Sequence, residues 1–364
     1  AQQVVALRTG GQAEKRAAVL ALLRAAAEGP ASMAGAVRAG AAKPLAKLLE
    51  DADDSMRGLA AAGIGAMVGA AGSAAQSAFA KAGAIPLLVK LLQVEAERPT
   101  QRAAAAALRN LAAGHDRNQA AIAQAGAVAP FVRLLKDGDP DTQAEAAAAL
   151  GNLAGDAPGL HYDKQVTIAR AGAIQPLVNL LRGDVPVVRE AAAGALRMLA
   201  ADNADNQVAI AQAGAIRLLV RLLLDTSQRA REEASAALGN LAFYNSETNR
   251  GNQVAIAEAG AVAPLVQLLA DPAPAICAAA AAALRNLMAR NWENQAAVAK
   301  VGGVAALVRL LRSGGPVAQA EAVGALRNFA ADSASRQAEI ARVGGLEPLF
   351  DLLEAEELSV REEA

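Results

Sequence analysis

The sequence has very little of the chemistry from which catalytic and metal sites are built. Among its 364 residues are one cysteine, two histidines and 2% aromatic residues. The single cysteine, Cys277, excludes an internal disulfide and favours a reducing compartment, so we expect an intracellular, cytoplasmic protein. Alanine and isoleucine flank Cys277 in the sequence and predict a buried, inert thiol.

An excess of one charge and long hydrophobic runs are also missing. With 35 basic and 36 acidic residues, the formal net charge is -1, which gives no electrostatic steering toward nucleic acid or an anionic membrane. The apolar run at 273–284 is too short to span a bilayer, and no signal-peptide pattern occurs. We therefore expect no nucleic-acid partner and no direct membrane insertion.

Familiar catalytic and cofactor motifs are absent from the sequence as well. It has no Walker A lysine motif, no HExxH, no GxSxG and no cysteine–histidine cluster with metal-ligand spacing. We expect no catalytic residue, no metal site and no cofactor, and therefore no enzyme. Because residue 1 is alanine, we expect this sequence to be part of a longer chain, and the sequence leaves open whether that chain has targeting signals or flanking domains.

What the sequence does contain is one motif repeated along its length. The stretch at 124–135 reads QAGAVAPFVRLL, and variants of the pattern AGA[IV]xPLVxLL recur throughout. The glycine of the motif falls at Gly40, Gly83, Gly126, Gly172, Gly214, Gly260, Gly302 and Gly344. Successive glycines are 42 to 46 residues apart, a period typical of solenoid repeats.

One unit, at 117–155, predicts three helices. Asn118 is expected to cap a short first helix at 119–124, and Gly126 to end it in a left-handed conformation. A second helix follows at 129–136, with Pro130 in its first turn. A turn then leads into a longer, alanine-rich third helix at 141–154, whose small side chains would let neighbouring third helices approach closely.

This unit of three helices, with a glycine between the first two, resembles the armadillo repeat family over the whole chain. HEAT repeats have two helices and lack the glycine, so they are the second choice. The resemblance implies an all-α, right-handed superhelical solenoid. We expect a single solenoid domain at 1–364, with seven complete repeats at roughly 30–333 and partial repeats at 1–29 and 334–364.

One armadillo subfamily is excluded by a specific position. Importin-α-type proteins carry tryptophan one helical turn before a recurring asparagine of the third helix. Here that position holds Ala106, Ala148, Ala236, Ala282 and Gly324. The sequence therefore does not resemble a classical nuclear-import receptor and is closer to generic plant, algal or vacuolar-scaffold-like armadillo proteins.

The recurring asparagines are the first candidate binding feature. They are Asn110, Asn152, Asn240, Asn286 and Asn328, and Arg24, Met67 and Met198 take their place in other units. The resemblance implies that such asparagines bond the main chain of an extended peptide, which suits a carboxamide because it both donates and accepts. The alternative is that they bond backbone groups of the neighbouring unit.

Charged residues accompany these asparagines. Seven residues before the asparagine, on the same helix face, alternate units carry Glu145, Glu233 and Glu321. Directly before the asparagine come Arg109, Arg197, Arg285 and Arg327. The glutamates could favour basic residues of a partner or stabilise the helix dipole, and the arginines could pair with them or contact acidic ligand groups. The sequence leaves open whether the net charge of this surface is positive or negative.

The junctions between a third helix and the next first helix are the second candidate feature. Two of them, at 155–164 and 243–251, carry four extra residues, and insertions at one junction emerge on one edge of a solenoid. The aromatic and histidine residues near the junctions are His115, His161, Tyr162, Phe243, Tyr244 and Trp292. We expect this edge to contact partners, the alternative being that each side chain covers the core of its own unit.

These patterns together favour a non-catalytic scaffold or adaptor that binds a protein or an extended peptide segment along the third helices. One alternative is an architectural subunit of a larger complex that uses the edge loops or the convex face. Another is a substrate-recruiting module of an enzyme whose catalytic domain lies outside this sequence.

Overall fold

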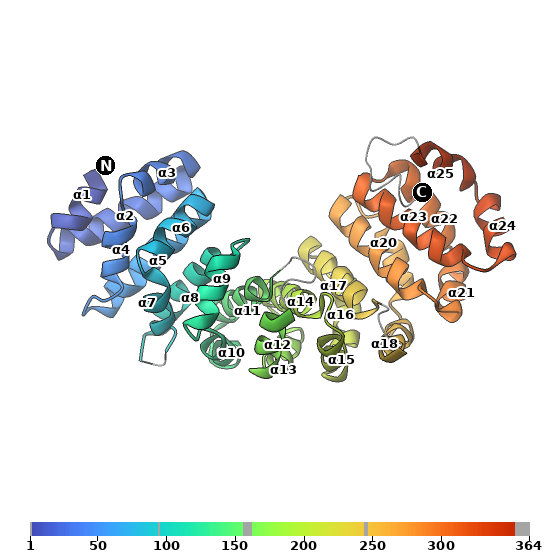
Figure 1. Cartoon of the computed structure of the whole chain (residues 1–364), viewed down its shortest axis with the longest axis horizontal. Helices are drawn as coiled ribbons and strands as arrows, with labels where there is room; N and C mark the ends of the chain where they lie inside the picture. Colours follow the sequence, from blue (N-terminus) through green and yellow to red (C-terminus); the bar gives the residue numbers. More distant parts are fainter. Residues whose placement is uncertain (1, 94, 156–161, 244–246, 354–364) are drawn as a thin grey trace. The chain divides into compact units, whose positions relative to one another are not determined.

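The computed structural model describes residues 2–93, 95–155, 162–243 and 247–353, and every regular element within these ranges is an α-helix (Figure 1). Two compact units divide the chain, at Ala1–Leu177 and Val178–Ala364. Most of the helices in each unit form successive repeats of one first helix, one second helix and one third helix. The all-α fold predicted from the repeat is therefore confirmed.

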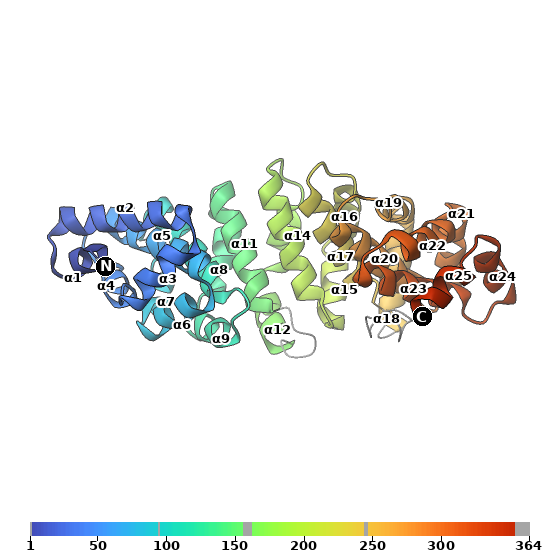
Figure 2. The ribbon, with the colours of Figure 1, turned by 90° about the horizontal axis from the view of Figure 1, so that it is seen from above.

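The unit at 1–177 begins with two helices and continues as three-helix groups. Its helices are α1 (Gln2–Thr9), α2 (Gln12–Glu28), α3 (Pro30–Arg38), α4 (Ala42–Leu48), α5 (Asp54–Ala71), α6 (Ser73–Lys81), α7 (Ala84–Lys90), α8 (Arg98–Ala112), α9 (Asp116–Gln124), α10 (Val128–Asp137), α11 (Pro140–Ala154), α12 (Tyr162–Arg170) and the start of α13 (Ile174–Leu180). The third helices α5, α8 and α11 pack side by side along this unit (Figure 2).

The unit at 178–364 follows the same order. Its helices are α14 (Pro186–Ala200), α15 (Ala204–Gln212), α16 (Ala215–Leu222), α17 (Gln228–Leu241), α18 (Glu247–Glu258), α19 (Val262–Leu268), α20 (Pro274–Met288), α21 (Trp292–Lys300), α22 (Gly303–Ser313), α23 (Pro316–Ala330), α24 (Ala334–Arg342) and α25 (Leu346–Leu353). Here α14, α17, α20 and α23 are the neighbouring third helices.

The motif glycine makes the turn between first and second helices. All eight copies have φ between +77° and +85°, a left-handed conformation that side chains with a Cβ rarely adopt. The prediction that Gly126 ends the first helix in this conformation is confirmed, since its φ is +82°. Proline opens several third helices, among them α11 and α20, where the missing N–H costs nothing.

Small residues allow the third helices to approach one another closely. A Cβ on Gly239 of α17 would lie 3.3 Å from the Cα of Ala283 in α20, and one on Gly65 of α5 would lie 3.4 Å from the Cα of Ala107 in α8. Gly65 and Gly239 thus allow the backbones of neighbouring third helices to lie against each other. The leucine and phenylalanine side chains fill the remaining core, with Phe79, Phe131 and Phe329 fully buried.

The predicted cap of the first helix is wrong. Asn118 does not precede α9 but lies in its first turn, buried, and its Nδ2 donates to the Leu111 carbonyl of α8 at 2.9 Å. The N-cap is His115, whose Nδ1 accepts from the Asn118 backbone N–H at 3.3 Å. Burial against the preceding helix, which a local pattern does not reveal, decides the place of Asn118.

A row of buried amides occupies the same place in other units. Asn206 and Asn294 donate to the carbonyls of Leu199 and Leu287, at 2.8 and 2.9 Å. The glutamine that follows each asparagine reaches the next carbonyl, as Gln207 does to Ala200 at 2.8 Å. These amides satisfy carbonyls at the C-terminal end of the third helix, which have no partner within the helix. We call this set the buried amide row.

Candidate binding surface on the third helices

The five recurring asparagines lie near the C-terminal ends of third helices and are half-buried in each case. We call them the asparagine ladder. Asn110 and Asn152 belong to α8 and α11 of the first unit, and Asn240, Asn286 and Asn328 belong to α17, α20 and α23 of the second. Each lies beside the preceding third helix of its own unit.

Each ladder asparagine donates one hydrogen bond to a backbone carbonyl of that preceding helix. The bonds run from Nδ2 of Asn110 to Gly65 at 2.9 Å, of Asn152 to Arg109 at 3.0 Å, of Asn240 to Arg197 at 2.9 Å, of Asn286 to Gly239 at 2.9 Å and of Asn328 to Arg285 at 2.9 Å. The alternative considered from the sequence, bonding to the neighbouring unit, therefore accounts for one N–H of each carboxamide.

The rest of each ladder carboxamide is unused. Its oxygen and its second N–H have no hydrogen-bond partner among the residues that the structure describes. A carboxamide has two donors and an acceptor oxygen with two lone pairs. Because one N–H is fixed by the neighbouring helix, the side chain is held in one orientation and presents a donor and an acceptor together.

The ladder register corrects one position. In the bonds made by the other four ladder asparagines, the accepting carbonyl belongs to the residue directly before the ladder position of the preceding helix. Asn110 bonds to the carbonyl of Gly65, so the ladder position of α5 is the residue after Gly65. The ladder position of α5 is therefore Ala66, not Met67 as the sequence pattern indicated. Met67 is fully buried and belongs to the core.

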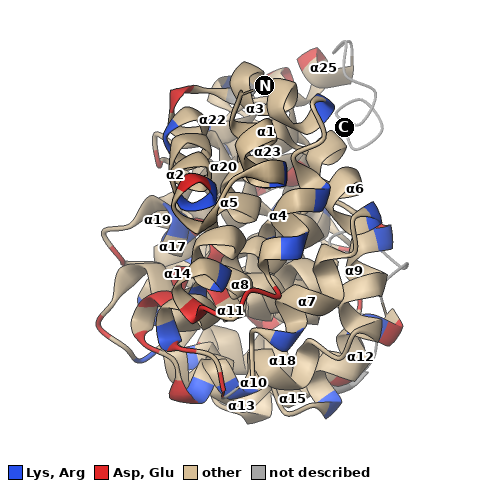
Figure 3. Cartoon of the chain, turned by 90° about the vertical axis from the view of Figure 1, so that its left-hand side faces the viewer, with Lys and Arg blue, Asp and Glu red and all other residues tan. Residues whose placement is uncertain are grey.

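The charged residues beside the ladder pair with one another between adjacent third helices. The nitrogen Nε of the arginine and an Oε2 of the glutamate are 2.9 Å apart in Arg109–Glu145, 2.7 Å in Arg197–Glu233 and 3.1 Å in Arg285–Glu321. These pairs cancel the charge of every glutamate in the predicted row. Arg327, on the last third helix, is exposed. Lysine and arginine are interspersed with acidic residues along the helices (Figure 3).

Burial changes the titration of one of these glutamates. Burial raises the pKa of Glu145 above its usual value and outweighs the opposing charge of Arg109, while nearby Asp141 raises the pKa further. Arg109 thus offsets part of the cost of burying the ionised carboxylate of Glu145. It is poorly placed to attract a basic residue of a partner, because its counter-ion is already supplied.

The decisive comparison concerns the repeat itself. A family model of the armadillo/β-catenin-like repeat matches six segments, at 75–113, 115–155, 162–201, 203–243, 249–289 and 293–331. The chain belongs to the armadillo/β-catenin-like repeat family. The fold is accordingly an armadillo solenoid, and the count of seven complete repeats at 30–333 stays a prediction.

Several solved structures that are similar to this chain are of engineered or designed proteins. One engineered protein is 30% identical over 100% of this chain and 96% of its own, with a TM-score of 0.76. A designed armadillo repeat protein in complex with the peptide (KR)4 is 30% identical over 67% of this chain and 99% of its own, with a TM-score of 0.59. Another, designed for modular peptide recognition, is 31% identical over the same shares, also with a TM-score of 0.59. Among curated proteins, none matches this sequence.

Some of the predicted edge residues lie in the part of the armadillo chain that the structure describes. Trp292, the first residue of α21, is 62% exposed, and Tyr162 and Phe243 are also exposed. Tyr244 and His161 lie outside the described residues. Most of the large apolar ring of Trp292 therefore faces solvent.

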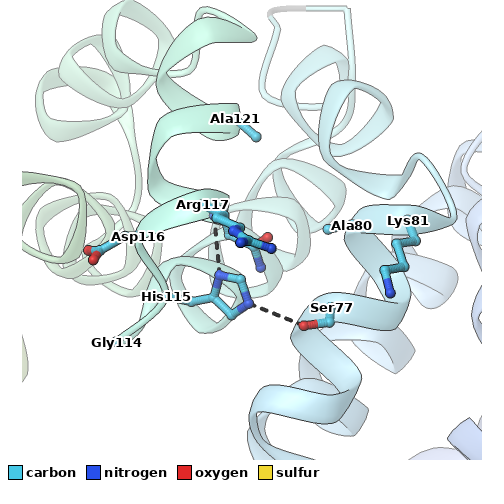
Figure 4. Close-up of a pocket in the computed structure, with 9 residues that line it drawn as sticks. Ser77, Ala80, Lys81, Gly114, His115, Asp116, Arg117 and Ala121 are labelled. Atoms are coloured by element: carbon cyan, nitrogen blue, oxygen red, sulfur yellow. Dashed lines mark hydrogen bonds between the residues drawn. The ribbon is translucent and has the colours of Figure 1, made fainter.

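His115, which the sequence placed at the edge, lines an open pocket between the first helices α6 and α9. The pocket encloses about 580 Å³ and is lined by Ser77, Ala80, Lys81, Gly114, His115, Asp116, Arg117, Asn118 and Ala121 (Figure 4). The imidazole lies between the two helices, with Nε2 of His115 3.3 Å from Oγ of Ser77. The sequence pattern gave no signal for this pocket because its residues come from two successive repeats.

The single cysteine of the armadillo chain lies in its core. Cys277 is buried, its Sγ donates to the Asp271 carbonyl at 2.9 Å, and burial raises the pKa of the thiol. Within the described ranges no three histidine, cysteine, aspartate or glutamate residues are grouped so that they could hold a metal ion. None of the described helices combines the length and apolar character needed to cross a bilayer.

Proposed function

We propose that this armadillo protein is a non-catalytic scaffold that binds an extended segment of a partner protein along its third helices. The observation that carries the proposal is the ladder carboxamide, which is oriented by one bond and leaves a donor and an acceptor unused. An extended main chain offers alternating N–H and C=O groups at a regular rise, so it matches a row of such carboxamides. The designed relatives that bind peptides support the same use of the fold.

The ion pairs beside the asparagine ladder indicate what kind of peptide segment can bind there. The designed relative is in complex with (KR)4, a purely basic peptide. In this chain Arg109, Arg197 and Arg285 already occupy the glutamates beside the ladder. A basic segment would have to displace an arginine from each glutamate. We therefore propose that the partner segment is not strongly basic and is recognised mainly through its backbone.

Capture of peptides tests this proposal. The protein is used to select from a displayed library of unstructured peptides, in parallel with a variant in which Asn110, Asn286 and Asn328 are changed to alanine. Asn206→Ala is the control because it removes one carboxamide from the buried amide row and lies outside the pocket of His115. We expect the ladder variant to recover few peptides and the control, if its helical circular dichroism is intact, to recover the wild-type set. Equal recovery by the ladder variant would show that the third helices are not the binding surface.

A second candidate function is an architectural role through the edge. The exposed indole of Trp292 favours it, because tryptophan is enriched among residues that dominate protein interfaces. Trp292→Ala should then weaken association with a larger complex without changing helical content. Peptide capture would be unaffected by this substitution, so the two functions give separable results.

A further inference from the structure

The pocket between α6 and α9 brings together two cations that have no counter-ion. Lys81, the last residue of α6, and Arg117, in the first turn of α9, both line the pocket and are both exposed. Neither makes an ion pair or a hydrogen bond within the described part of the chain. Asp116 also lines the pocket, but its carboxylate points away (Figure 4), and its charge acts on Lys164.

Hydrogen bonds fix which donors face this pocket. The Asn118 backbone N–H donates to Nδ1 of His115, so in the neutral ring the proton is on Nε2. Nε2 then donates to Oγ of Ser77, 3.3 Å away. The Ser77 hydroxyl proton is left free to point into the cavity. Serine, lysine and arginine donors, with the first turn of α9, therefore border one space.

The other first helices of the chain serve as an internal comparison. Where α6 has Ser77, the equivalent residues are Ala34, Ala120, Val166, Val208, Val254, Ala296 and Ala338. Where α9 has Arg117, they are Ala31, Ala74, Asp163, Asp205, Gly251, Glu293 and Ser335. Where α9 has His115, α15 and α21 are capped by Asn203 and Asn291.

The repeat itself does not require these polar residues. The same turn and helix form with alanine or valine in place of Ser77, with acidic residues in place of Arg117 and with asparagine in place of His115. All three departures coincide at one interface, where Lys81 also lies. The hydrogen bond between His115 and Ser77 accounts for two of these departures, whereas no contact of the described residues accounts for Arg117. Two unpaired cations that line one pocket repel each other. Binding of an anion would relieve that repulsion.

We propose that this pocket binds a phosphate monoester dianion carried by a phosphorylated serine or threonine of a protein partner. A phosphate group has three terminal oxygens, which suit the ammonium of Lys81, the planar guanidinium of Arg117 and the Ser77 hydroxyl. The helix N-terminus of α9 adds favourable N–H dipoles. A pocket of about 580 Å³ also has room for the residues that flank a phosphorylated side chain. This site is separate from the third-helix surface and does not depend on it.

Calorimetric titration of the full chain at low ionic strength tests the site. The probes are inorganic phosphate, a short phosphoserine peptide, its unphosphorylated form, and vesicles containing a phosphoinositide. We expect the phosphopeptide to bind more tightly than inorganic phosphate, and the unphosphorylated peptide not to bind. Tighter binding to the vesicles than to the phosphopeptide would replace the protein partner with a membrane, and no binding of any phosphate probe would overturn the site.

Substitutions locate the binding. Lys81→Gln with Arg117→Gln should weaken phosphopeptide affinity by at least about tenfold, because charge-assisted bonds to phosphate are lost. His115→Asn introduces the residue type that caps α15 and α21. It should therefore preserve the fold while weakening phosphopeptide affinity several-fold. Lys300→Gln, at the position in α21 equivalent to Lys81, is the matched control and should change nothing. Unchanged affinity in the Lys81/Arg117 double variant would contradict the proposal.

Discussion

At the scale of single residues, the same amide side chain has two different places in each unit. In the ladder, the carboxamide of Asn286 donates to the Gly239 carbonyl and keeps polar atoms free. In the buried amide row, Asn294 donates to the Leu287 carbonyl and, at 3.4 Å, to that of Gln253. The ladder residue is half-buried and the row residue is buried, so water can replace the lost partner only at the ladder.

This difference predicts unequal losses of stability. Asn286→Ala should lower the free energy of unfolding by about 0.5–1.5 kcal/mol, the net value of one hydrogen bond. Asn294→Ala should cost about 1–3 kcal/mol, because it leaves buried carbonyls without a donor. Urea denaturation of each variant measures both. A larger loss for Asn286→Ala than for Asn294→Ala would show that the ladder is mainly structural.

A second residue-scale prediction concerns the turn after the third helix. Asp332 has φ +56° there, and Gly114 occupies the equivalent turn with φ +58°. Glycine adopts this conformation without the strain that a Cβ brings. Asp332→Gly should therefore raise the free energy of unfolding by up to about 1 kcal/mol, and Gly114→Ala should lower it by a similar amount. Thermal melts of the pair would reject this explanation if both variants changed in the same direction.

At the scale of helices, ion pairs link the N-terminal ends of neighbouring third helices. Asp225, before α17, accepts from Arg189 of α14 at 2.7 Å, and Arg231 of α17 donates to the Asp225 carbonyl at 2.9 Å. Burial on its own would raise the pKa of Asp225. The hydrogen bonds from Ser227 and Arg189 and the charges of Arg189 and Arg231 outweigh burial and hold that pKa below its usual value of 3.8.

A lowered pKa means that the ionised form of Asp225 stabilises the folded chain. This contribution is fully present above the unfolded value of 3.8 and is lost as the pH falls through the lower folded value. Asp225→Asn should cost about 1–3 kcal/mol near neutral pH and progressively less in acid. Denaturation at several pH values measures the difference. Asp184→Asn, at an exposed position, is the control, and a difference for Asp225→Asn that is constant with pH would contradict the account.

The helices themselves were predictable from the sequence, for a physical reason. The motif glycine must adopt a left-handed turn, and that requirement is written into each unit at a fixed place, as at Gly126. The position of Asn118 was not predictable, because an asparagine before a helix and one buried in its first turn have the same local pattern. Contact with α8 decides between them, and that contact joins residues of two helices.

At the scale of the whole chain, the candidate surface was only partly predictable. Spacing identified the ladder asparagines and the alternation of Glu145, Glu233 and Glu321. Spacing did not show that each glutamate pairs with an arginine of the preceding repeat, because that pairing depends on the register of adjacent third helices. The pocket lined by Ser77, Lys81, His115 and Arg117 was not predictable for the same reason, because it depends on how the first helices α6 and α9 pack against each other.

The most direct test of the central claim observes the ladder carboxamides while a peptide is bound. In ¹⁵N-labelled protein, the side-chain amide signals of Asn110, Asn152, Asn240, Asn286 and Asn328 are assigned by single substitutions and followed during titration with a peptide selected by capture. We predict that ladder signals shift to saturation with the peptide, while those of Asn206 and Asn294 in the buried amide row stay in place. A saturated complex in which the ladder signals do not move would contradict backbone recognition by the third helices.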